Sequence, residues 1–211
     1  MGRIRLESVE ATGGDPPLTC GVANAMPGHT RPDVNEAFLM HGTNAGVLLN
    51  ILAGGLNERY AGTGAGAAYG EGVYLAEDAG KNDQYTKADL QHGGEPELHH
   101  RLYARGAGHH PGTVFYILVC RVALGHQVRT KGSGKLAMSH DTNRPVFPIS
   151  FRELDRVDGV SPDVLHHSLR APDPKPADVR YREFVVFHSE YTYPEYLLAY
   201  QRFEGDRGPL A

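Results

Sequence analysis

The stretch TVFYILVCRVAL, residues 113–124, decides the class of fold. Its side chains are almost all β-branched, aromatic or aliphatic, which is typical of a strand that is buried on both faces. Further strand patterns occur before and after it: FLM at 38–40, GVYLA at 72–76, EFVVF at 183–187 and YPEYLLAY at 193–200. Strands therefore make up most of the regular structure that the sequence predicts.

Helices are expected in two places. Apolar residues recur at helical spacing after Asn44, and Gly54 with Gly55 is a stop signal. The FLM strand is expected to end in a turn before this helix. Asp78 can open a second, short helix that carries Tyr85, whereas residues 91–112 lack periodicity and read as irregular. Because strands rarely alternate with helices, the sequence predicts an α+β fold and not a doubly wound sheet.

The length of 211 residues suits one domain. We expect residues 1–34 to hold a strand at 4–9 and a Gly/Pro-rich loop, residues 35–203 to form the body of the domain, and 204–211 to be a tail. No run of about eighteen apolar residues predicts a membrane span, and the N-terminus lacks the apolar core of a secretory signal. Cysteine usage (two residues, Cys20 and Cys120) favours a reducing setting, cytoplasm or nucleus. The net charge of −4 argues against a dedicated nucleic-acid coat.

Three features could carry chemistry on the evidence of the residues alone. His41, Gly42 and Thr43 lie where a strand gives way to a helix, although a simple turn histidine is the favoured interpretation of this tripeptide alone. Of Tyr69, Tyr74 and Tyr85, the last two could flank one flat ring, although ordinary core packing is favoured when these residues are considered alone. Glu183 opens an otherwise apolar strand, where a carboxylate is costly unless it is paired or functional.

The twelve histidines include three adjacent pairs, 99–100, 109–110 and 166–167. No helical His-x-x-x-His spacing or cysteine accompanies them, and neighbouring residues of a strand point to opposite faces. We therefore expect the pairs to lie in solvated loops, and a zinc site is possible but unsupported.

These features occur together, in order, in a chain that resembles the catalytic domain of the poly(ADP-ribose) polymerase-like ADP-ribosyltransferases, most closely the tankyrase type. The matching segments are FLMHGTNAGVLLNILAGGL at 38–56, YGEGVYLAEDAGKNDQY at 69–85, VFYILVCRVALG at 114–125, HSLRA at 167–171 and YREFVVFHSEYTYPEYLLAYQ at 181–201. The resemblance implies two packed, mainly antiparallel sheets with an NAD cleft and a few short helices.

The resemblance also implies roles. The family's defining His, Tyr and Glu fall on His41, Tyr74 and Glu183. It assigns His41 to the adenosine ribose of NAD and the Gly42 backbone to the nicotinamide amide, with Tyr74 and Tyr85 on the two faces of the nicotinamide ring.

Further residues are placed at the NAD site by position. Thr43 follows the His-Gly pair, and residues 57–68 would form the loop over NAD, from which Tyr60 or Arg59 would touch the diphosphate. Asn82 stands where relatives often have a small hydroxyl residue, so its contact with the nicotinamide amide would differ. Tankyrases have a Cys-rich zinc site in the segment corresponding to 91–112, which has no cysteine here, so no metal is expected.

The chemistry implied is transfer of ADP-ribose to protein side chains. Cleavage of the nicotinamide–ribose bond builds positive charge on the ribose, as in glycoside cleavage, and Glu183 would stabilise that charge and help to activate the acceptor. Since mono-transferring and inactive relatives usually lack this glutamate, its presence permits chain elongation to poly(ADP-ribose).

Auto-modification, a monomer and no membrane partner are expected. The alternatives are a mono-ADP-ribosyltransferase toxin or effector that acts on nucleic acid, and a module that binds NAD or ADP-ribose without turnover.

Overall fold

The computed structural model describes residues 29–60, 67–104, 109–160, 164–172, 181–204 and 207–209. The strand expected at 4–9, Cys20 and the middle of the loop expected at 57–68 lie outside these residues. The strands are β1 (Glu36–Thr43), β2 (Val73–Ala76), β3 (Asp89–Leu90), β4 (Thr113–Ala123), β5 (Gln127–Arg129), β6 (Ser168–Arg170), β7 (Glu183–Val186), β8 (Thr192–Tyr200), β9 (Phe203–Glu204) and β10 (Arg207–Pro209). The helices are α1 (Ala45–Gly54), α2 (Ala79–Asp83) and α3 (Pro96–Tyr103), with the 3-10 turns η2 (Pro32–Val34), η3 (Glu58–Tyr60) and η4 (Ser189–Tyr191).

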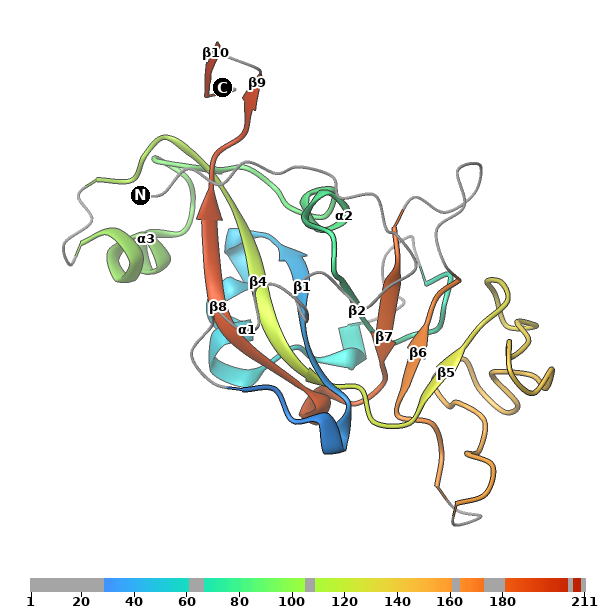
Figure 1. The fold of residues 1–211 in the computed structure, drawn as a ribbon. Helices are drawn as coiled ribbons and strands as arrows, with labels where there is room; N and C mark the ends of the chain where they lie inside the picture. Colours follow the sequence, from blue (N-terminus) through green and yellow to red (C-terminus); the bar gives the residue numbers. More distant parts are fainter. Residues whose placement is uncertain are drawn as a thin grey trace.

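Eight of the described strands form one mainly antiparallel sheet. Seven of them follow the order β3-β4-β1-β2-β7-β6-β5, and β8 pairs with β4 (Figure 1). The sheet has two halves. Strands β1, β4 and β8 pair along most of their lengths, whereas β1 meets β2 at the single pair Met40–Ala76. The predicted α+β fold, with mainly antiparallel strands and a few short helices, is confirmed, and the described strands from β1 to β8 form one sheet whose halves are joined at this pair.

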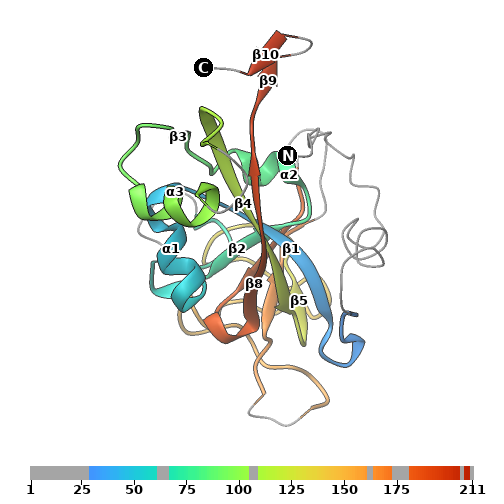
Figure 2. The ribbon, with the colours of Figure 1, turned by 90° about the vertical axis from the view of Figure 1, so that its left-hand side faces the viewer.

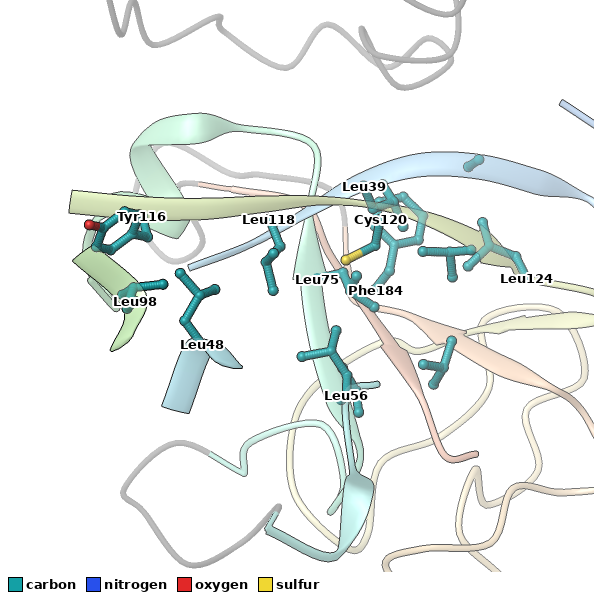
Figure 3. Packing of buried hydrophobic residues seen from close by; sticks show 14 of the residues in the cluster. Leu39, Leu48, Leu56, Leu75, Leu98, Tyr116, Leu118, Cys120, Leu124 and Phe184 are labelled. Carbon is teal, nitrogen blue, oxygen red and sulfur yellow. The ribbon is translucent and has the colours of Figure 1, made fainter. Parts of the chain in front are cut away.

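Strand β4 is buried on both faces, as its composition predicts. Tyr116, Leu118 and Cys120 point to one face, where they pack with Leu48 of α1 and Leu98 of α3 (Figure 3). Phe115, Ile117 and Val119 point to the other face, where Ala79 of α2 and residues of β8 join them. Figure 2 shows α1 and α3 on the same side of β4.

The second half has a core of its own. Val185 and Phe187 pack against Leu169 of β6 and Val128 of β5, with Phe147 from the long segment between β5 and β6. The parallel pairing of β5 with β6 is the one exception to the antiparallel order among the described strands.

Two expectations about where elements end were wrong. Strand β1 does not end in a turn at His41 but continues to Thr43, because its pairing with β4 runs through Thr43–Tyr116. Helix α2 ends at Asp83, so Tyr85 lies in the following turn and not in the helix. No described helix is both long enough and apolar enough to cross a membrane.

A third expectation was also wrong: the segment 91–112, which was expected to be irregular, contains helix α3. Pro96 occupies the first turn, where a missing N–H costs nothing, and Leu98 is buried against the core. With one buried face of so few residues, the helix leaves little periodicity to read. His99 lies on this helix and His110 is buried, so the expectation of solvated loops is wrong for these two histidines.

Candidate active site

A cavity of about 650 Å³ lies at the junction of the two halves, between β1, β2, α1 and α2. Eight of the residues expected at the NAD site line it: His41, Gly42, Thr43, Tyr60, Tyr74, Asn82, Tyr85 and Glu183. Arg59, the expected alternative to Tyr60, is not among the lining residues. His41, Tyr74 and Glu183 come from β1, β2 and β7, which are consecutive neighbours in the sheet. The structure thus brings together residues that are far apart along the chain.

Gly42 allows α2 to approach β1. A Cβ atom built on Gly42 would lie 2.0 Å from the backbone oxygen of Asn82, a separation that no side chain tolerates. The glycine therefore serves a close backbone approach, which sets the position of the helix that carries Lys81 and Asn82.

His41 is held in one tautomer. Its Nδ1 lies 2.8 Å from the carbonyl oxygen of Tyr74 and must donate to it, which leaves Nε2 as an acceptor. Burial lowers the pKa of His41, while the hydrogen bond to Tyr74 acts in the opposite direction. The imidazole is therefore neutral near pH 7 and offers a lone pair to a hydroxyl donor.

Tyr74 is fixed at its hydroxyl group. That group donates to the carbonyl of Gly70 at 2.8 Å and accepts from the backbone N–H of Tyr69 at 2.7 Å. Burial is the main cause of the raised pKa of Tyr74, so the phenol stays protonated. With its polar end tied to the turn, Tyr74 presents its ring and not its hydroxyl to the cavity.

Glu183 forms an ion pair that sequence reasoning missed. Nζ of Lys81 lies 3.1 Å from Oε1 of Glu183, and the two side chains are only 17% and 13% exposed. The same ammonium lies 5.0 Å from the centre of the Tyr85 ring. Burial disfavours the ammonium, but Tyr85 and Glu183 outweigh it and raise the pKa of Lys81. The four-residue spacing of Lys81 and Tyr85 could have indicated the contact between these two side chains.

Asn82 is turned towards the backbone. Its Nδ2 donates to the carbonyl oxygens of Asp78 at 2.8 Å and Ala76 at 3.4 Å, so both amide hydrogens are used. Only Oδ1 is left to accept from a ligand. A small hydroxyl group could both donate and accept at this position, so the substitution changes what the site can offer.

Tyr60 and Tyr85 form the rim of the cavity, with 77% and 54% of their surfaces exposed. The opposite wall is apolar and comes from α1, through Val47 and Ile51, which the sequence did not indicate as site residues. The helical pattern that predicts α1 does not distinguish a face that packs from a face that lines a cavity.

Comparisons with known proteins agree with this geometry. A family model described as the poly(ADP-ribose) polymerase catalytic domain matches residues 24–202. The human protein mono-ADP-ribosyltransferase PARP14 is 32% identical over 171 residues, which cover 80% of this chain and 7% of that protein. The mouse and human proteins named protein mono-ADP-ribosyltransferase PARP11 are each 34% identical over 68 residues, 32% of this chain and 20% of theirs. The chain thus spans a small part of the length of these relatives.

Proposed function

The chain belongs to the family of poly(ADP-ribose) polymerase catalytic domains, and on this basis we propose that it is an NAD-dependent ADP-ribosyltransferase that modifies protein side chains. The observation that carries the proposal is that His41, Tyr74 and Glu183 line one cavity from three adjacent strands. Auto-modification, a monomeric enzyme and a cytoplasmic or nuclear setting go with this proposal.

The residues present fit NAD. The cavity volume of about 650 Å³ is in the range of small-molecule sites. Nε2 of His41 can accept a hydrogen bond from a ribose hydroxyl, and the Tyr74 ring can face a flat heterocycle whose second face is covered by Tyr85. The apolar wall of α1 is suited to the adenosine end.

Glu183 would act on the charge that develops during transfer. In NAD the nicotinamide ring is cationic while it is bound to the ribose. When the glycosidic bond breaks, the ring takes the bonding electron pair and leaves as neutral nicotinamide, so that positive charge develops on the ribose. A carboxylate in the cavity stabilises that charge, and it can accept a proton from an acceptor hydroxyl. The proposed transfer needs no metal, because the carboxylate and the charge of the leaving group suffice.

Lys81 would be a positioning residue for this step. A carboxylate that is mostly out of water needs a cation or hydrogen-bond donors to remain ionised and oriented. The ammonium at 3.1 Å fills this role, and its contact with Tyr85 connects the carboxylate to the ring-stacking part of the site.

Incubation of the purified chain with labelled NAD tests the proposal. We expect transfer of label to the chain itself, and a loss of about 100- to 1000-fold in rate for Glu183→Gln. Glu190→Gln, an exposed glutamate in η4, is the matched control and should behave as wild type. If NAD stays intact with the wild type and with added protein acceptors, the proposal fails.

The length of the product decides between two modes of the same activity. The Glu183 carboxylate provides the group needed to activate a ribose hydroxyl of a growing polymer, so elongation is permitted. Mass analysis of the modified protein should give either a ladder of ADP-ribose units or a single unit per site. A single unit would agree with the names of the relatives PARP14 and PARP11, which are called protein mono-ADP-ribosyltransferases.

A further inference from the structure

A second group of polar side chains lies apart from the residues that line the NAD cavity, at the start of β4. Asp89 lies on β3, His99 on α3, and His110 just before β4, and their side chains meet where β3 pairs with β4 through Asp89–Val114. Figure 2 shows β3 and α3 beside the same end of β4. One ligand atom from each residue lies within 4.8 Å of the others. None of the three takes part in the proposed transfer.

The distances within the group are short. Nε2 of His99 lies 2.9 Å from each carboxylate oxygen of Asp89, and Nε2 of His110 lies 3.4 Å from Oδ2. The imidazole rings are 4.4 Å apart between centres. Tetrahedral zinc, with bonds of about 2.0–2.1 Å, places neighbouring ligand atoms roughly 3.3 Å apart, close to these separations.

Burial and charge give an independent reason to expect a cation here. The side chains of Asp89 and His110 are 2% and 4% exposed, and that of His99 is 14% exposed. In the part of the chain that the structure describes, Asp89 has no lysine or arginine partner; its partners are the two imidazoles and the Tyr116 hydroxyl. A buried carboxylate with no permanent positive charge beside it is costly, and a divalent ion would neutralise it.

The surroundings resemble an outer shell of a metal site. Tyr116 donates to Oδ2 of Asp89 at 2.7 Å, and its oxygen lies 3.0 Å from that of Tyr103. The phenol of Tyr116 thus orients the carboxylate as a hydrogen-bond donor. The 14% exposure of His99 provides a side from which an ion can enter.

We infer that Asp89, His99 and His110 bind one divalent transition-metal ion, for which two imidazole nitrogens and one carboxylate oxygen are the donor set of zinc. The ion would tie β3, α3 and the start of β4 together, in a segment with little other periodic structure. The inference reverses the expectation from the sequence that no metal is bound, and it is independent of the proposed transfer.

Metal binding must break one hydrogen bond, the one between Gly112 and His110. The backbone N–H of Gly112 donates to Nδ1 of His110 at 3.2 Å, which leaves the ring proton on Nε2, facing Asp89. Metal ligation by Nε2 requires that proton to move to Nδ1, so this long hydrogen bond must break. Its loss is small beside three metal–ligand bonds, and the Gly112 amide becomes a reporter of binding.

The experiment is metal analysis of the full chain after removal of any affinity tag, incubation with zinc and desalting. We expect one zinc ion per chain, a melting temperature that a chelator lowers and zinc restores, and a zinc-dependent shift of the Gly112 amide resonance. His99→Ala and His110→Ala should lose the ion, whereas His100→Ala, an exposed neighbour on the same helix, should keep it.

Tyr116→Phe provides a second test that does not depend on whether the two histidine variants fold. It removes only the hydroxyl that orients Asp89, so zinc should still bind, about 10- to 100-fold more weakly. Trace zinc in the loaded wild type, with no effect of the chelator and an unmoved Gly112 amide, would overturn the inference. The group would then be a network of hydrogen bonds around Asp89. Zinc retained equally by His99→Ala and wild type would also overturn it.

Discussion

Gly42 is the residue on which the contact of β1 with α2 depends. The nearest obstacle to a Cβ atom there is a backbone oxygen, 2.0 Å away, which cannot move without shifting the helix. We expect Gly42→Ala to lower the free energy of unfolding by about 1–3 kcal/mol and to weaken NAD binding, because α2 carries Lys81 and Asn82. Gly94→Ala is the control, since nothing lies within 4 Å of its Cβ position. Equal denaturation midpoints for the two variants would contradict the close-approach explanation.

Lys81 should affect turnover more than binding. Lys81→Met removes the cation beside Glu183 while keeping the apolar stem of the side chain, so we expect kcat for NAD cleavage to fall about 10- to 100-fold with a smaller change in KM. Steady-state kinetics beside Lys87→Met, an exposed lysine after α2, measures the difference. A rise in KM with unchanged kcat would show that Lys81 binds substrate and does not position the carboxylate.

His41 should make stability depend on pH. Because burial lowers its pKa from the ordinary value of 6.5, the unfolded chain binds the proton more tightly than the folded one. The contribution of neutral His41 to stability is therefore complete above pH 6.5 and is lost as the pH falls through the lowered pKa. The free energy of unfolding, measured in urea from pH 7.5 to 5, should fall less for His41→Gln than for wild type. His100→Gln should match wild type, and parallel curves for all three proteins would refute the assignment.

Strand β4 is the element that the sequence predicts best, and its energetics can be tested in the same way. Leu118 is fully buried between α1, α3 and the rest of the first core, so Leu118→Ala should cost about 2–5 kcal/mol of unfolding free energy. Leu136→Ala, at a side chain that is 91% exposed, should cost less than about 0.5 kcal/mol. Chemical denaturation measures both, and a similar cost at the two positions would mean that β4 is not the centre of the core.

Elements were predictable where burial is continuous. The apolar runs of β4 and β7 and the helical spacing of α1 follow from their own residues, and the family resemblance located the NAD site on them. Helix α3 was not predictable, since its eight residues bury only Leu98 and Tyr103. The Lys81–Glu183 ion pair was missed for another reason, because its partners meet only when β7 pairs with β2. The likeness to the tankyrase type, within the family, stays a prediction.

At the scale of the whole molecule, the cavity lies where the two halves are joined by the single pair Met40–Ala76. His41 belongs to one half, and Tyr74 and Glu183 belong to the other. A ligand that contacts both halves of the sheet adds connections between them where the strands make few. A smaller ligand that contacts one half cannot do so. Binding of NAD should therefore stabilise the whole fold more than binding of nicotinamide alone or of ADP-ribose alone.

Thermal denaturation with three ligands tests this coupling. Any ligand present at 100 times its Kd stabilises the folded protein by about 2.7 kcal/mol. The three ligands are therefore compared at one common concentration, where the order of melting temperatures reports the order of affinities. We expect a non-cleavable NAD analogue to raise the melting temperature most, with smaller shifts for nicotinamide and for ADP-ribose. Tyr85→Ala should remove the nicotinamide shift and keep the ADP-ribose shift, because Tyr85 lines the cavity beside Lys81, where we propose that the nicotinamide ring stacks. Tyr193→Ala, 66% exposed on β8, should change neither. If Tyr85→Ala kept the full nicotinamide shift, the nicotinamide ring would not stack on Tyr85, and this assignment would be wrong.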